Sequence, residues 1–141
     1  MAYEHPEYLI SVAELAEQIE NPSLRVFDTS VLLHHTEQGY RSEPGRTHYL
    51  AEHIAGAGFL NLSEDWSDTR SAYDNTLPSL EALAGAIGRD GIAQDNLVVL
   101  YSSSHLVWAT RAWMAILCSM SGLLKIQNLT RYPSVDDSNC V

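Results

Sequence analysis

The chain has 141 residues, 45% of them hydrophobic, which suits one domain with one core. Its eighteen acidic and eight basic residues give a net charge of −10, which argues against a nucleic-acid partner because phosphate binding needs clustered Lys and Arg. No apolar run approaches the roughly 18 residues of a membrane helix, and the acidic N-terminus is unlike a secretory signal, so we expect a cytoplasmic protein without a membrane partner.

The first expected elements are a helix and a strand. Ser11 and Glu14 form the S-x-x-E pattern of a capping box, which predicts a helix that starts there and ends at the Asn-Pro of residues 21–22. The apolar run 24–27 is rich in strand formers and closes at Asp28, so it predicts a strand.

The next part of the chain is mostly polar. Residues 31–47 contain scattered Gly and Pro and predict a loop with at most one helical turn. A short helix is expected over 49–53, followed by a glycine-punctuated turn that feeds a strand over 58–62. A second polar loop is expected over 63–76.

The second half gives clearer signals. The apolar spacing of Leu80, Leu83, Ala84 and Ile87 predicts a helix that opens at Ser79, and residues 88–96 form a turn. Residues 97–101 are continuously hydrophobic, which is typical of a strand buried on both faces. A helix is expected over 107–120, with an apolar stripe, and a last strand over 123–129. The stripe comprises Trp113, Ile116, Leu117 and Met120.

Strands that alternate with helices predict an α/β fold, a parallel sheet with helices on both faces. No repeat or internal linker divides the chain, so residues 1–130 are expected to form one domain. The polar tail 131–141 has no periodicity and is expected to be disordered.

The loop 102–105 reads Ser-Ser-Ser-His and is called the serine loop below. It follows the strand 97–101 directly, and in α/β proteins ligands and nucleophiles sit at that position. One hypothesis is hydrolysis, with a serine nucleophile, His105 as base and Asp28 as the orienting acid. The G-x-S-x-G elbow of α/β hydrolases is absent, which favours a polar loop without this chemistry.

The stretch "YLAEHIAGAGFL" carries a more specific pattern. It resembles the first signature of the rhodanese (thiosulfate sulfurtransferase) family, with alanine in place of the signature's proline. A turn of small residues explains the stretch, and His53 is expected to hydrogen-bond nearby backbone. The matching positions are Tyr49, His53, Ile54, Gly56, Ala57 and Leu60, and Ala55 replaces the proline.

The resemblance covers residues 9–122 and implies a roughly five-stranded parallel sheet flanked by helices. Active members of the family place a cysteine directly after the strand that precedes the loop, and this position falls on Ser102. The cysteine thiolate carries sulfur as a persulfide, which a serine hydroxyl cannot do. The chain thus resembles the N-terminal, non-catalytic domain of two-domain sulfurtransferases, and the family's paired-glycine turn and closing helix are missing, as in a truncated product.

An anion-binding role is still implied for the loop. Backbone N–H groups at a helix N-terminus hold anions, so Ser102, Ser103, Ser104 and His105 could bind a small oxyanion such as thiosulfate or sulfate. Arg111, which the family's N-terminal domains keep, could hold that anion or a partner domain, or could form a helix salt bridge instead. Trp108 and Trp113 are expected in the core or in a domain interface.

No metal or cofactor is expected. His34 and His35 are adjacent, and adjacent side chains point apart, so they make a poor chelating pair. Cys118 is expected to be a buried, inert thiol beside the apolar face of its helix. Cys140 lies in the acidic tail, where Asp136 and Asp137 disfavour a thiolate.

The sequence therefore predicts a sulfurtransferase domain that is catalytically silent on its own. An active sulfurtransferase that uses another thiol or a separate catalytic domain remains an alternative, and so does a docking or regulatory module. If the last strand joins the sheet without a closing helix, an uncovered apolar face predicts self-association or a partner such as a catalytic rhodanese domain.

Overall fold

The structure is a computed structural model and describes residues 4–119 and 128–130. Its elements follow the chain in the order η1 (Pro6–Tyr8), β1 (Leu9–Ile10), α1 (Val12–Gln18), β2 (Leu24–Asp28), β3 (Val31–Thr36), β4 (Gly39–Pro44), α2 (Arg46–Ala51), β5 (Gly58–Phe59), α3 (Leu80–Arg89), β6 (Leu97–Tyr101), α4 (Leu106–Ser119) and β7 (Asn128–Thr130).

A five-stranded sheet in the order β1-β7-β6-β2-β5 forms the centre of the fold. Every neighbouring pair in it is parallel, which confirms the predicted sheet. The longest pairing joins β2 to β6, from Leu24 opposite Leu97 to Asp28 opposite Tyr101. Because the two strands end in register, the loops that follow Asp28 and Tyr101 start side by side.

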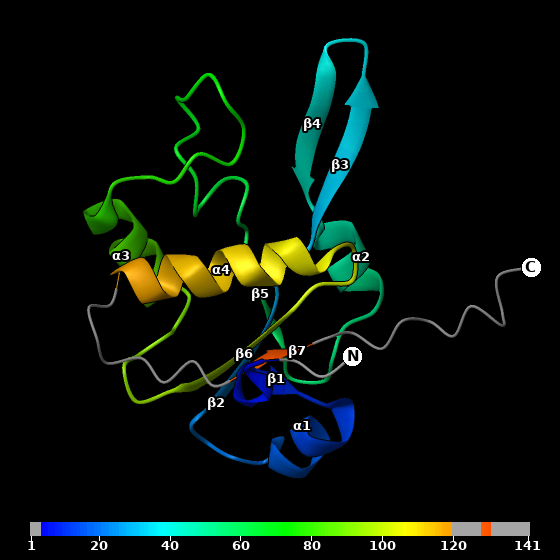
Figure 1. The fold of residues 1–141 in the computed structure, drawn as a ribbon, viewed down its shortest axis with the longest axis vertical. Helices are drawn as coiled ribbons and strands as arrows, with labels where there is room; N and C mark the ends of the chain where they lie inside the picture. The colour runs from blue at the N-terminus through cyan, green and yellow to red at the C-terminus, as the bar shows by residue number, and fades with distance from the viewer. Residues whose placement is uncertain (1–3, 120–127, 131–141) are drawn as a thin grey trace, which may run out of the picture.

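Helices cover both faces of the sheet, as the sequence predicts (Figure 1). Alternate residues of β6 enter different cores: Val98 and Leu100 pack with residues of α3 and α4, whereas Val99 and Tyr101 pack with Leu15 of α1. All four β6 side chains are buried, which accounts for the continuous hydrophobicity of this strand.

The helix starts follow their sequence signals. At α1, Ser11 Oγ accepts the Glu14 N–H at 3.2 Å and Glu14 accepts the Ser11 N–H at 2.7 Å, so the predicted capping box is present. At α3, Ser79 Oγ accepts the Ala82 N–H at 3.2 Å. Both helices therefore begin where a hydroxyl satisfies an N–H of the first turn.

The buried faces of α3 and α4 differ from the predicted stripes. In α3, Leu80 is exposed while Leu83 is buried. In α4, Leu117 is 42% exposed, and Met120 lies outside the described residues. Alanines occupy much of the buried face of α4, where the sequence predicted larger apolar residues. Their small side chains let α4 lie close to the sheet and to α3. The buried residues of α4 are Trp108, Ala109, Ala112, Ala115 and Ile116.

The predicted loop 31–47 is wrong over most of its length. Residues 31–44 form an antiparallel hairpin of β3 and β4 that projects from the sheet beside the loop 63–76 (Figure 1). Residues 37 and 38 connect the two strands, and Gly39, the first residue of β4, has a φ of +124°, which favours glycine. Most of the hairpin is exposed, so the apolar alternation that would have signalled strands is missing.

Other boundaries shift by a few residues. The helix expected over 49–53 is α2, which begins earlier, and the strand expected over 58–62 is the two-residue β5. Of the strand expected over 123–129, the structure describes only β7, which pairs with β1 and β6, and the tail 131–141 lies outside the described residues. Within the part of the chain that is described, no helix has the length and apolarity to cross a membrane.

Candidate functional site

The serine loop lies at the carboxyl end of β6, next to residues 29 and 30 at the end of β2. Thr29 fixes this arrangement, because its N–H and its Oγ1 both donate to the Tyr101 carbonyl at 2.8 Å. Thr29 and Ser30 are completely buried at this edge of the sheet. The position is the one where ligands commonly bind in open parallel sheets.

Ser102 has an inward-facing side chain and is only 6% exposed. Its Oγ accepts the N–H groups of Ser104 at 3.3 Å and His105 at 3.2 Å. These donors lie just before the first residue of α4, so Ser102 satisfies N–H groups where the loop enters the helix.

Ser30 completes the hydroxyl network from the neighbouring strand end. Its Oγ accepts the Ser103 N–H at 2.8 Å, and it lies 2.9 Å from Ser103 Oγ. Ser104 Oγ donates to the Val31 carbonyl at 2.9 Å. The N–H groups of Ser103, Ser104 and His105 therefore all donate to serine hydroxyls, and an oxyanion in the loop would have to displace these bonds.

Sequence reasoning did not identify Ser30. The signal was present, because Ser30 comes two residues after a predicted strand end, and the carboxyl ends of parallel strands meet at one edge. The serine loop is therefore positioned by a residue 73 positions away in the sequence.

The His105 side chain accepts a backbone hydrogen bond in the first turn of α4. Its Nδ1 accepts the Val107 N–H at 3.1 Å, so in the neutral ring Nε2 carries the proton. Ser102 Oγ is engaged instead with Ser30 and Ser104 hydroxyls, at 3.4 and 3.2 Å. The serine–imidazole hydrogen bond that hydrolysis requires does not occur among the described residues.

Asp28 and Tyr101 form a buried polar pair below the serine loop. Asp28 is 1% exposed, and its Oδ1 accepts the Ser30 N–H at 2.8 Å. The Tyr101 hydroxyl accepts the Ile54 N–H at 3.1 Å. Burial raises the pKa of Tyr101 above its ordinary value, and a hydrogen bond to the Asp28 carboxylate raises it further, against the lowering effect of the Ile54 N–H. The pair joins the serine loop to the turn at Ile54.

The signature stretch forms that turn. Tyr49 donates from its hydroxyl to the Ala57 carbonyl at 2.7 Å, and its ring stacks on His53 with centroids 4.0 Å apart. His53 Nδ1 lies 2.7 Å from the Tyr49 carbonyl, which confirms the expected backbone hydrogen bond. Gly56 has a φ of +79°, a conformation that favours glycine.

Arg111 is directed to the loop 63–76 and not to the serine loop. Its Nη2 donates to the Trp66 carbonyl at 3.2 Å, Ser67 Oγ at 3.1 Å and the Asn75 carbonyl at 2.7 Å. Burial lowers the pKa of this guanidinium. No carboxylate among the described residues pairs with it, so the helix salt bridge weighed from the sequence does not form there, and the contact with an anion or a partner domain stays a prediction.

Two clefts of about 430 Å³ each flank the serine loop, and His48 of α2 lines both. The first is lined by Asp28, His48, Ala51, Glu52, His53, Ile54, Tyr101 and Ser103. The second, called the histidine groove below, is lined by Val31, Leu32, Leu33, His34, His48, Ser104, His105 and Trp108.

The expected burial of Cys118 is wrong, because the structure exposes this thiol on the outer face of α4. Burial of Cys118 was predicted from its place beside Leu117 in the apolar stripe, but the buried face of α4 includes three alanines and neither of these two residues. Cys140 lies outside the described residues. Trp108 belongs to the larger core and Trp113 packs against it, in agreement with a packing role.

Two known proteins illustrate what the chain is similar to in sequence. Thiosulfate sulfurtransferase of Cricetulus griseus is 36% identical over 111 residues, which are 74% of this chain and 35% of that protein. The 3-mercaptopyruvate sulfurtransferase of Escherichia coli (strain K12) is 32% identical over 99 residues, 70% of this chain and 34% of that protein. The chain thus spans about a third of the length of these relatives.

The fold is also found among solved structures. The crystal structure of SseA from Escherichia coli, described as the rhodanese fold of 3-mercaptopyruvate sulfotransferases, matches with a TM-score of 0.70 at 28% sequence identity. The match covers 86% of this chain and 44% of that one. No protein-family profile matches the chain.

Proposed function

The chain is a domain of the rhodanese family of sulfurtransferases, and we propose that it is the non-catalytic half of a two-domain enzyme, silent in sulfur transfer on its own. The observation that carries this proposal is Ser102, which stands directly after β6, at the position where the resemblance implies a cysteine.

A serine at this position cannot replace the sulfur carrier. Its hydroxyl is far less acidic than a thiol and contains no sulfur atom to hold a persulfide. Ser102 is also nearly buried, and its Oγ already accepts two N–H groups. The side chain therefore serves the loop and the start of α4, which supports a structural role.

The length of the match supports the same proposal. The match covers about a third of the two curated relatives named above, and the rest of such an enzyme has room for a second rhodanese domain that carries the thiol. Such a catalytic domain is the partner that we propose for this chain.

The alternative thiol on this chain is poorly placed. Cys118 is exposed, but it is twelve positions after Leu106, the first residue of α4, which corresponds to about 18 Å along a helix. At that distance the loop and the N-terminal end of the helix would not act on its sulfur. A sulfur carrier needs N–H donors or positive charge beside the thiolate.

The first test is sulfur transfer from thiosulfate to cyanide, followed as thiocyanate. We expect no turnover above buffer for the full chain, and no change in the Cys118→Ala variant. Turnover by the chain that disappears with Cys118→Ala would overturn the proposal and make Cys118 the sulfur carrier. Tight binding of a protein partner without turnover would favour the docking module.

A second test places a thiol where the cysteine is missing. In Ser102→Cys, in a Cys118→Ala/Cys140→Ala background, Sγ would receive the N–H groups of Ser104 and His105 at the start of α4. Burial raises a thiol pKa, but two N–H donors and a helix N-terminus lower it more, so we expect a thiol pKa about one unit or more below the ordinary value.

The matched control is Ser103→Cys in the same background, because residue 103 is exposed and its side chain accepts no backbone N–H. Thiolate absorbance at 240 nm, followed against pH, measures both pKa values. An equal pKa for the two thiols would mean that the loop does not have the preorganised N–H donors of a retired catalytic loop.

A further inference from the structure

We propose that the histidine groove binds a small organic anion with an apolar body, and that it binds this anion more tightly as the pH falls from 8 to 6. The groove has about 430 Å³, enough for a small ring compound, and three imidazoles reach it from β3, α2 and the serine loop. This site is distinct from the loop N–H groups and does not depend on whether the chain transfers sulfur.

The first argument is charge. Among the residues that the structure describes, histidine is the ionisable type that lines the histidine groove, through His34, His48 and His105, and no described carboxylate lines it. The other cleft beside the serine loop contains Asp28 and Glu52, and the cleft between the hairpin and the loop 63–76 contains the three carboxylates of Glu64, Asp68 and Asp74 against one cation, Arg41. In a chain of net charge −10, the histidine groove is therefore the cleft among these three that repels an anion least.

The second argument is the direction of the donors. His105 Nδ1 accepts the Val107 N–H, so its Nε2–H is left to donate. The His48 side chain has no hydrogen bond or ion pair with any residue that the structure describes. His48 can therefore take up a proton and meet an anion without breaking an existing bond.

The third argument is the apolar wall. Trp108 lies at the base of the groove and is 8% exposed. Leu32 and Leu33 lie on the hairpin side, and Leu33 is 53% exposed. An aromatic or branched ligand would cover Leu33 and the exposed edge of Trp108, which adds a favourable apolar contribution that a simple inorganic ion lacks.

The pH dependence follows from the charges on each element around the groove. From the hairpin, Glu43 lies 2.6 Å from His34 Nε2, and Arg41 stands opposite His34 in the strand register. From α2 comes His48, which also lines the first cleft together with the carboxylates Asp28 and Glu52. From the loop comes His105, whose protonation at Nδ1 would break its bond to Val107. His48 is thus the imidazole of the groove that can become an imidazolium without losing a hydrogen bond or ion pair to a described residue, and an imidazolium is the form that attracts an anion.

The experiment uses naphthalene-1-sulfonate, whose charge stays constant between pH 6 and 8, and calorimetric titration of the full chain. We expect a dissociation constant about threefold lower at pH 6 than at pH 8, the effect of one exposed ion pair. Uncharged naphthalene-1-sulfonamide, which has nearly the same shape, should show the same weak binding at both pH values.

Variants test the role of His48. His48→Gln should remove most of the pH dependence, whereas His35→Gln should preserve it, because His35 packs on Tyr40 and does not line the groove. Both side chains are exposed, and unchanged thermal midpoints will show that the variants fold. Equal affinity for sulfonate and sulfonamide at pH 6, or a pH dependence that survives His48→Gln, would overturn the proposal.

Discussion

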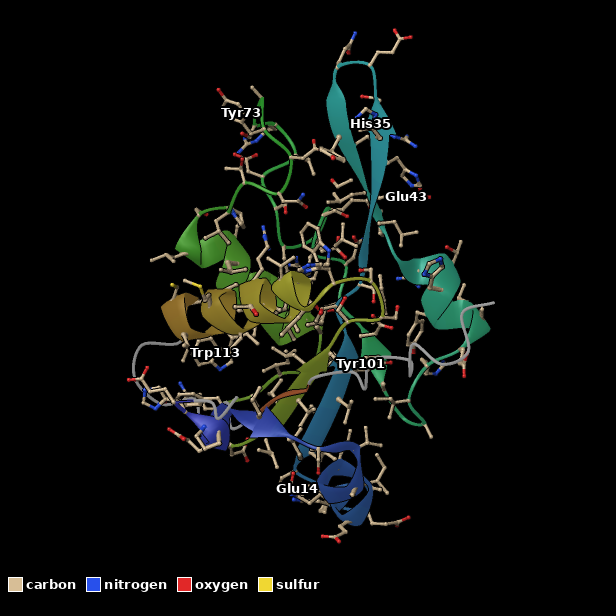
Figure 2. All side chains as sticks on the ribbon, turned by 45° about the vertical axis from the view of Figure 1, so that its right-hand side comes forward. Glu14, His35, Glu43, Tyr73, Tyr101 and Trp113 are labelled. Atoms are coloured by element: carbon tan, nitrogen blue, oxygen red, sulfur yellow. The ribbon has the colours of Figure 1, made fainter. Side chains whose placement is uncertain are left out.

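The serine loop and the loop 63–76 both pack on α4, but they are held in different ways. Four neutral hydroxyls from Ser30, Ser102, Ser103 and Ser104 share the hydrogen bonds of the serine loop. The longer loop 63–76 receives three hydrogen bonds from one charged side chain, Arg111. In Figure 2 this loop carries Tyr73 at its far end, beside the hairpin with His35 and Glu43.

Because of this difference, we expect a single substitution to destabilise the loop 63–76 more than the serine loop. A neutral hydrogen bond contributes about 1 kcal/mol to stability, and one to a charged group contributes about 1.5–3 kcal/mol. In the serine loop the remaining hydroxyls can take over part of a lost contact. In the loop 63–76 the loss of Arg111 removes three contacts together, and leaves carbonyls of Trp66 and Asn75 without their donor.

The largest expected effect is that of Arg111→Ala. We expect the free energy of unfolding to fall by about 2–4 kcal/mol, because one substitution leaves several acceptors unpaired and opens a space beside α4. Urea denaturation measures the loss. Limited trypsin digestion measures local opening, since Arg70 lies within the loop and should be cleaved faster in this variant.

Arg111→Lys and Arg70→Gln are the matched controls. Lysine retains the charge with a single donor group and should recover part of the stability. Arg70 is 91% exposed and pairs with Asp68, so its loss should cost less than about 0.5 kcal/mol. If Arg111→Ala changed neither the unfolding curve nor the cleavage rate, the loop 63–76 would not depend on Arg111 for its stability.

An intermediate effect is expected for Tyr101→Phe, which removes the hydroxyl below the serine loop. The Ile54 N–H loses its acceptor and the Asp28 carboxylate loses a donor, at a cost of about 1–2 kcal/mol near neutral pH. Because the folded-state pKa of Tyr101 lies above its unfolded value near 10, this stability is present below pH 10 and is lost as the pH rises further.

Denaturation in urea between pH 7 and 11 tests both parts of this prediction. Above pH 10 the native chain should lose at most about 1.4 kcal/mol per pH unit from this one group. Tyr101→Phe should start lower and fall less steeply. Tyr40→Phe is the control, because Tyr40 is 69% exposed on the hairpin. Parallel curves for the native chain and Tyr101→Phe would contradict the burial of this hydroxyl.

The same two loops show how far the sequence predicts the structure. The serine loop was located correctly because β6 is hydrophobic at every position and ends at Tyr101. Its internal bonds were not predicted, since Ser30 reaches it only through strand pairing. The hairpin was missed because its exposed strands lack apolar alternation. A pattern of hydrophobicity reports burial, and neither an exposed hairpin nor a hydroxyl network depends on burial of apolar residues.

Arg111 shows a second limit on what the sequence can predict, because its partners could not be identified from residue types. The helix predicted over 107–120 from its apolar stripe correctly placed Arg111 on a helix that packs in the core. Its acceptors are two backbone carbonyls and one hydroxyl, from a loop about 40 residues away, and carbonyls carry no residue-type signal. By contrast, the role of His53 was predictable, because its acceptor, the Tyr49 carbonyl, is only four residues away, in the short helix α2 that ends just before His53.

The smallest expected effect is that of Ser102→Ala. It removes the acceptor of two backbone N–H groups, and the loss of such neutral hydrogen bonds costs about 1 kcal/mol. The effect should stay near that value, because Ser30 still holds the Ser103 N–H. Ser103→Ala, at an exposed position with one hydroxyl contact, should cost less than about 0.5 kcal/mol.

The double variant Ser30→Ala/Ser102→Ala decides whether the hydroxyls act as a network. Side chains that share partners are not additive, so the double variant should lose more than the sum of the two single losses, measured by urea denaturation. Additive losses would mean that each hydroxyl acts alone. The serine loop would then depend on single contacts as the loop 63–76 depends on Arg111, and the contrast between the two loops would reduce to the charge of the donor.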